Sequence, residues 1–113
     1  MIDTNWTKVA TTEDVKRAGG LLGRSIGGIS IALYLVDGAY FATSDLCTHG
    51  QARLSEGYLD GFLIECPLHQ GLFDVRTGEV EGPPCTKAVL AFPVRVDGEY
   101  LFVDLAAAAP AEK

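Results

Sequence analysis

Short runs of alternating apolar and polar residues cover most of the chain, and glycine-containing turn signals separate them. ISIALYLV (residues 29–36) and AYFAT (39–43) flank Asp37-Gly38, a pair that accepts the positive φ angles of a tight hairpin turn. The same kind of signal recurs at Gly27-Gly28, Asp60-Gly61 and Asp97-Gly98. Four tight turns in so short a chain predict an all-β fold, an antiparallel sandwich or barrel.

Helical signals are confined to one short segment. TTEDVKRAGG (residues 11–20) offers a threonine cap, acidic residues in the first turn and Gly19 as a stop, which predicts one or two turns of helix. The tail, residues 106–113, has nothing to pack and is expected to fray. With no internal repeat or linker, residues 1–105 are predicted to form a single domain.

Composition narrows the class of protein. A chain of 113 residues with 48% apolar and 21% charged residues is typical of one globular domain. No apolar run approaches the roughly 20 residues that span a bilayer, and the polar start does not resemble a secretory signal, which together predict a cytoplasmic protein. The net charge of −6 disfavours binding to nucleic acid and to anionic membranes.

Both histidines and two of the three cysteines lie between residues 47 and 71. They form two similar motifs, Cys47-x-His49 and Cys66-x-x-His69, each with a glycine soon after the histidine. An odd number of cysteines in a reducing compartment favours metal ligands over disulfides. Two metal sites suit this donor set: a tetrahedral Cys2His2 zinc site, or a 2Fe-2S cluster with two cysteines on one iron and two histidines on the other.

The pattern C-x-H-x16-C-x2-H resembles the Rieske signature, and mixed Cys-His halves suit a two-iron cluster better than a zinc finger. The stretch CTHGQARLSEGYLDGFLIECPLHQGLFDVRTG is similar to the ferredoxin components of bacterial aromatic-ring-hydroxylating dioxygenases. The resemblance implies a Rieske-type fold with a small cluster-binding subdomain, about residues 44–86, formed by two ligand loops. It also implies one 2Fe-2S cluster, with Cys47 and Cys66 on the ferric iron and His49 and His69 on the iron that changes valence.

The resemblance further implies a carrier rather than an enzyme. Such a protein is a soluble, monomeric one-electron carrier from an NAD(P)H-dependent flavin reductase to the terminal oxygenase in aromatic hydrocarbon catabolism. The alternatives are a small Rieske-like subunit of a nitrite reductase and a structural Cys2His2 zinc module. The sequence shows no nucleophile elbow, phosphate loop or dinucleotide fingerprint.

High-potential members of the family have a disulfide between the ligand loops and hydroxyl groups near the cluster. Here the corresponding positions are Ala52, Leu68, Gly71 and Phe73, which supply neither the disulfide nor the hydroxyls. Fewer hydrogen bonds to the cluster sulfurs imply a lower potential, near the low end of the Rieske range at roughly −150 mV.

Other residues near the motifs have expected roles in the cluster surroundings or in docking. The cluster surroundings are expected to include Gly50, Leu68, Gly71, Phe73, Pro83 and Pro84, with Leu46 and Leu54 as either shielding or plain core. Cys85 is expected to be a packed thiol outside the ligand set. Gln51 and Gln70 are expected beside the exposed imidazole edges. The acidic residues Asp45, Glu56, Glu79 and Glu81 either ring this docking tip or are scattered surface charges, and Asp45 and Arg53 form either a second shell to the ligands or a surface ion pair.

Overall fold

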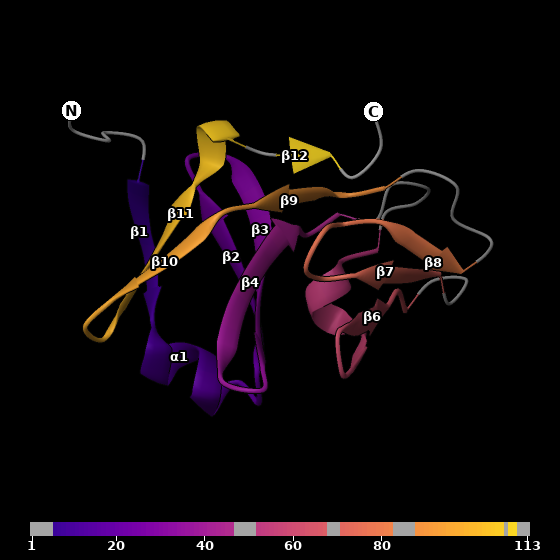
Figure 1. Cartoon of the computed structure of the whole chain (residues 1–113), viewed down its shortest axis with the longest axis horizontal. Coiled ribbons are helices and arrows are strands. Elements are labelled where there is room, and N and C mark those ends of the chain that lie inside the picture. Colours follow the sequence, from indigo (N-terminus) through magenta and orange to yellow (C-terminus); the bar gives the residue numbers. More distant parts are fainter. Residues whose placement is uncertain (1–5, 47–51, 68–70, 83–87, 108, 111–113) are drawn as a thin grey trace.

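The computed structural model describes residues 6–46, 52–67, 71–82, 88–107 and 109–110 (Figure 1). Within these residues the chain is mostly β-structure and forms three antiparallel sheets. The predicted all-β, antiparallel class is therefore confirmed. The first strand, Trp6–Thr11, was not predicted, because no turn signal precedes it in the sequence.

Two of the sheets make up the larger part of the molecule, on the left of Figure 1. The five-stranded sheet has the order β12-β9-β4-β3-β2, and the three-stranded sheet has the order β1-β11-β10. The strands of the first sheet are β2 (Leu21–Ile26), β3 (Ile29–Val36), β4 (Ala39–Ser44), β9 (Leu90–Phe92) and β12 (Ala109–Pro110). Those of the second are β1 (Trp6–Thr11), β10 (Val94–Asp97) and β11 (Tyr100–Asp104).

The third sheet forms a separate lobe on the right of Figure 1, with the order β5-β6-β7-β8. Its strands are β5 (Tyr58–Asp60), β6 (Leu63–Glu65), β7 (Leu72–Asp74) and β8 (Val80–Gly82), and the 3-10 helix η1 (Leu54–Glu56) precedes them. All of these elements fall within residues 44–86, the range expected for the cluster-binding part. The lobe is inserted between β4 and β9, which are hydrogen-bonded neighbours in the five-stranded sheet.

The predicted hairpin turns are present, two of them displaced by one residue. Gly27-Gly28 and Asp37-Gly38 have positive φ at both positions, as a type I′ turn requires. In the other two hairpins Asp60 pairs with Leu63 and Asp97 pairs with Tyr100. Each aspartate is thus the last residue of its strand, and the turns are residues 61–62 and 98–99, which corrects the predicted positions.

The predicted helix is α1 (Thr12–Arg17), and its N-terminal cap is Thr11. The Thr11 side chain accepts a hydrogen bond from the Asp14 N–H, and the Asp14 carboxylate accepts one from the Thr11 N–H, both at 3.0 Å. This reciprocal pair is a capping box. At the other end of the chain, the 3-10 helix η2 spans Leu105–Ala107, and β12 pairs with β9.

Two hydrophobic cores meet at β3. Its residues Ala32, Tyr34 and Val36 belong to the core of the small lobe, which also contains Leu54, Ile64, Cys66, Phe73, Val75 and Val89. Ile31 and Leu33 belong to the core between the two larger sheets. Because neighbouring residues of a strand point to opposite faces, β3 links the lobe to the sandwich through its two buried faces.

Candidate metal centre

The first ligand loop is closed at its base by backbone contacts between residues 45–46 and 53–54. The carbonyl of Asp45 accepts a hydrogen bond of 2.6 Å from the Leu54 N–H, and Leu46 forms a β-bridge with Arg53. Cys47, His49, Gly50 and Gln51 lie between these two ends, outside the described residues.

The second ligand loop connects β6 to β7. At its base the Cys66 N–H donates a hydrogen bond of 2.8 Å to the Gly71 carbonyl. Leu68, His69 and Gln70 follow within the loop and lie outside the described residues. Cys66 itself is fully buried.

The bases of both loops are anchored in one core. Leu54, from the end of the first loop, and Cys66 and Phe73, from the second hairpin, are all fully buried members of it. The Cα of Gly57 also lies against the Glu65 carbonyl, so close that a Cβ at this position would overlap the oxygen. The two segments that carry the predicted ligands therefore leave the same small lobe.

Cys66 fits the role of a ligand to a metal cluster. A thiolate is the metal-binding form of cysteine, and burial of a charge is costly unless it is paired or bound to a metal. Cys66 is buried in the core of the lobe, just after β6, so its surroundings suit a coordinated thiolate that is shielded from water. It is the member of the predicted ligand set that falls within the described part of the chain.

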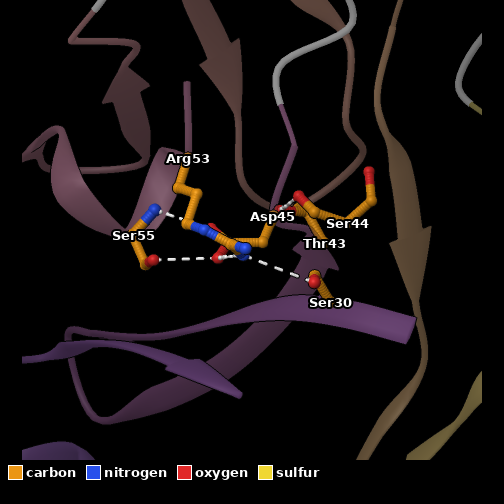
Figure 2. Close-up of polar contacts among 6 residues, drawn as sticks. All are labelled: Ser30, Thr43, Ser44, Asp45, Arg53 and Ser55. Atoms are coloured by element: carbon orange, nitrogen blue, oxygen red, sulfur yellow. Dashed lines mark hydrogen bonds and ion pairs between the residues drawn. The ribbon is translucent and has the colours of Figure 1, made fainter. Parts of the chain in front are cut away.

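Asp45 lies in a polar network at the base of the first ligand loop (Figure 2). Its Oδ1 accepts a hydrogen bond of 2.7 Å from the Ser55 N–H, and its Oδ2 accepts one of 2.9 Å from the Ser55 hydroxyl. Arg53 Nη1 lies 3.5 Å from Oδ2 and 3.3 Å from Ser30 Oγ. The Asp45 side chain is 3% exposed and that of Arg53 49%, so Asp45 is a buried residue bound mainly to Ser55 rather than half of a surface ion pair.

A second buried polar pair lies next to this network. The hydroxyls of Tyr34 and Thr43 are 2.8 Å apart, and Thr43 Oγ1 donates to the Ser44 carbonyl at 2.9 Å. Burial, with a smaller contribution from the charge of Asp45, raises the pKa of Tyr34 far above its ordinary value. Tyr34 is therefore a neutral packing residue at any physiological pH.

The structure separates the remaining predicted residues into buried and exposed positions. Gly71, Phe73 and Leu54 are buried, Ala52 is half-buried and Leu46 is 49% exposed. Glu56, Glu79 and Glu81 are exposed. Asp45 is buried, so it belongs neither to an acidic ring at the docking tip nor to the scattered surface charges, the two alternatives given for it. Pro83, Pro84 and Cys85 lie outside the described residues.

Two residues of the site were missed by the sequence reasoning, Ser55 and Gly57. Ser55 holds Asp45, and Gly57 allows η1 to approach β6. Both belong to the stretch Leu54-Ser55-Glu56-Gly57. A serine and a glycine just after a ligand loop are the available signal, but these residue types are common in ordinary turns.

Comparisons with known proteins define the class. The Rieske [2Fe-2S] domain model matches residues 5–93, and the chain belongs to this family. A Rieske [2Fe-2S] domain carries one 2Fe-2S cluster, so the predicted cofactor is confirmed.

Within the family, the chain belongs with the ferredoxin components of aromatic-ring dioxygenase systems. It is 44% identical over 100 residues to the ferredoxin component of the naphthalene 1,2-dioxygenase system of Pseudomonas putida, covering 88% of this chain and 95% of that protein. Among solved structures, the ferredoxin of Sphingomonas yanoikuyae B1 matches with a TM-score of 0.83 and 37% identity, covering 88% of this chain and 98% of that one. A complex of reduced oxygenase and oxidized ferredoxin in carbazole 1,9a-dioxygenase matches with a TM-score of 0.79 and 38% identity, covering 98% and 97%.

The part of the chain that the structure describes contains no helix long and apolar enough to cross a bilayer.

Proposed function

We propose that this chain is a cytoplasmic, monomeric electron carrier that takes single electrons from an NAD(P)H-dependent flavin reductase and passes them to the terminal oxygenase of an aromatic-ring dioxygenase system. The observation that carries the proposal is similarity along almost the full length of a dioxygenase ferredoxin component. The solved complex of an oxygenase with a related ferredoxin supports the terminal oxygenase as the acceptor. Acting as a carrier, the protein needs no substrate pocket of its own.

We propose Cys47, His49, Cys66 and His69 as the ligands of the cluster. When bound, a Rieske cluster supplies one reversible one-electron couple. The protein holds Cys66 buried in the apolar core of the lobe, which excludes water from this side of the site. The hydrogen bond from the Cys66 N–H to the Gly71 carbonyl closes the base of the second loop, and His69 lies between these two residues in the sequence.

Metal and sulfide analysis tests the assignment. Protein purified anaerobically should contain two irons and two acid-labile sulfides per chain and should be red-brown. One zinc with no sulfide would instead identify the structural zinc module. A nitrite reductase subunit would copurify in a fixed ratio with its enzyme, whereas a carrier remains separate.

Substitution of the cysteines tests the ligand set. Cys66→Ser should lose the cluster and its visible absorption, because a buried hydroxyl is a poor ligand for ferric iron. Cys85→Ser is the matched control and should keep both iron and spectrum. Loss of iron in Cys85→Ser together with its retention in Cys66→Ser would overturn the assignment.

We propose that Gln51, Gln70, Glu56 and Glu81 face the partner proteins. Glu56 and Glu81 are exposed, and acidic side chains near the ligand loops would steer the carrier toward a basic docking face. Stopped-flow reduction of the oxygenase should slow with added salt, and the double variant Glu56→Lys/Glu81→Lys should slow it at low salt with an unchanged midpoint potential. A rate independent of ionic strength would contradict steering by charge.

A further inference from the structure

We propose that Asp45 is a positioning residue for the first ligand loop. Its carboxylate, held by Ser55, fixes the base of the loop so that Cys47 and His49 are presented to the cluster in one arrangement. This inference rests on the ligand set proposed above and concerns residues that do not themselves bind metal.

Besides the 3.5 Å contact with Arg53, three shorter hydrogen bonds join Asp45 to Leu54 and Ser55 at the end of the loop. The Asp45 carbonyl accepts from the Leu54 N–H at 2.6 Å. The carboxylate accepts from the N–H and the hydroxyl of Ser55, at 2.7 and 2.9 Å. One residue thus holds two consecutive residues on the far side of the loop, and the ends of the loop cannot separate without breaking all three bonds.

Asp45 is also tied to the sandwich. Its N–H donates a hydrogen bond of 3.0 Å to the Ser30 carbonyl, next to the β3–β4 ladder. The loop base is therefore fixed to the five-stranded sheet on one side and to η1 on the other. Cys47 follows Asp45 by only two residues, so any movement of Asp45 is passed directly to a ligand.

The carboxylate is suited to this task because its two oxygens bind two different donors. Hydrogen bonds to a charged acceptor are shorter and stronger than neutral ones, and both Ser55 bonds are short. Arg53 contributes less, since its contact with Oδ2 is 3.5 Å long and its side chain is half exposed. Ser55 is consequently the partner that holds the carboxylate.

Gly23 in β2 leaves room for the Asp45 and Ser55 side chains. A Cβ added to Gly23 in β2 would lie 2.6 Å from Ser55 Oγ and 3.2 Å from Asp45 Oδ2. Any larger side chain at position 23 would push the Ser55 hydroxyl away from the carboxylate. Gly23 therefore offers a way to disturb the pair from outside the loop.

The first experiment measures cluster retention and electronic structure in Asp45→Ala and Ser55→Ala. Asp45→Ala frees the base of the loop that carries two of the proposed ligands, so it should lose its visible absorption severalfold faster than the wild type in the presence of an iron chelator. The EPR spectrum of the reduced protein and the midpoint potential should shift as well. Ser55→Ala removes one of the three bonds and should change each quantity in the same direction by less.

Gly23→Ala provides an independent test that leaves Asp45 and Ser55 in place. It should reproduce the Ser55→Ala changes, because it displaces the same hydroxyl. In the double variant Gly23→Ala/Ser55→Ala the effects should not add, since the second substitution removes the group that the first one moves.

Asp104→Ala is the matched control. Asp104 in β11 is also a buried aspartate, 7% exposed, and accepts a hydrogen bond of 3.0 Å from the Ala106 N–H. It lies in the three-stranded sheet, so its loss should lower the melting temperature without changing the EPR spectrum, the potential or the bleaching rate.

Unchanged EPR spectrum, potential and bleaching rate in Ser55→Ala and Gly23→Ala would overturn the proposal, even if Asp45→Ala failed to fold. The wild-type protein separates this result from a failure of the proposed function. If the wild type contains no iron and sulfide, the function is wrong; if it contains both and the variants match it, only the role of Asp45 is wrong.

Discussion

Asp74 is a buried carboxylate that forms both an ion pair and hydrogen bonds with Arg76. Its Oδ1 accepts from the Arg76 N–H and Nε, at 2.8 and 3.0 Å, and its Oδ2 accepts from Nη2 at 2.8 Å. The guanidinium also lies over the Phe62 ring, 4.1 Å from its centroid, where it gains a cation–π contact. The side-chain hydrogen bond from Arg76 is the main cause that lowers the pKa of Asp74 from 3.8.

This shift predicts how stability depends on pH. Because the pKa is lower in the folded than in the unfolded chain, ionised Asp74 stabilises the fold above the unfolded value, and that contribution is lost as the pH falls through the folded value. Asp74→Asn should therefore lower the free energy of unfolding near pH 7, with a difference from the wild type that shrinks below about pH 4. Urea unfolding followed by circular dichroism at several pH values measures this difference. A pH-independent deficit in Asp74→Asn would contradict the prediction.

At the scale of the elements, hairpins were the most predictable features because their signals are local. Positive φ angles select glycine and aspartate at the turn residues, so Asp37-Gly38 identified the β3–β4 hairpin from the sequence. The turns at Gly61 and Gly98 were displaced by one residue because both begin with the glycine, at φ 61° and 63°. A turn of type II′ needs a positive φ only at its first residue, and the preceding aspartate stays in the strand.

Contacts between distant segments could not be predicted in the same way. The pairing of β1 with β11 joins segments near the two ends of the chain. The residue pattern of neither strand indicates which strand it pairs with. At the site, the spacing of Cys66 and His69 gave the motif, but the hydrogen bonds from Ser55 to Asp45 depend on how η1 folds back. The ligand motif could therefore be predicted from the sequence, whereas the hydrogen bonds that orient the ligand loop could not.

Gly57 gives an element-scale prediction about the lobe. Its φ of −91° suits any residue, but a Cβ would overlap the Glu65 carbonyl and force η1 away from β6. Gly57→Ala should cost about 1–3 kcal/mol of stability, as overpacking does, and should lower the iron content. Gly38→Ala is the control: its φ is 79° with open space around it, so it should cost about 1 kcal/mol with full iron content. Equal iron content in the two variants would contradict a specific role for Gly57.

At the scale of the whole molecule, the two hydrophobic cores have different roles: both stabilise the fold, but only the core of the lobe contains a proposed cluster ligand. The core between the larger sheets contains Leu101 and Val103, both fully buried. The core of the lobe contains Cys66. The two are joined through β3, so global stability supports both, but only the lobe core surrounds a ligand.

Leu101→Ala tests this division. A buried leucine replaced by alanine typically costs 2–5 kcal/mol, so the free energy of unfolding should fall by about that amount. The visible and EPR spectra at low temperature should match those of the wild type, because the cavity lies in the other core. Thermal unfolding combined with EPR measures both quantities. A shifted EPR spectrum in folded Leu101→Ala would show that the cores are not independent.

The insertion of the lobe between two adjacent strands bears on how such proteins can be recombined. Since β4 and β9 are neighbours, a donor lobe from a related ferredoxin has to span only a short gap and could be transplanted between them. Deletion of the lobe would instead destabilise the sandwich. The lobe covers Ala32, Tyr34 and Val36 of β3, and without it these residues would form an exposed apolar surface. A successful graft must bring apolar residues equivalent to Leu54, Ile64 and Val75. The exchangeable module is therefore the lobe together with the complementary face of β3.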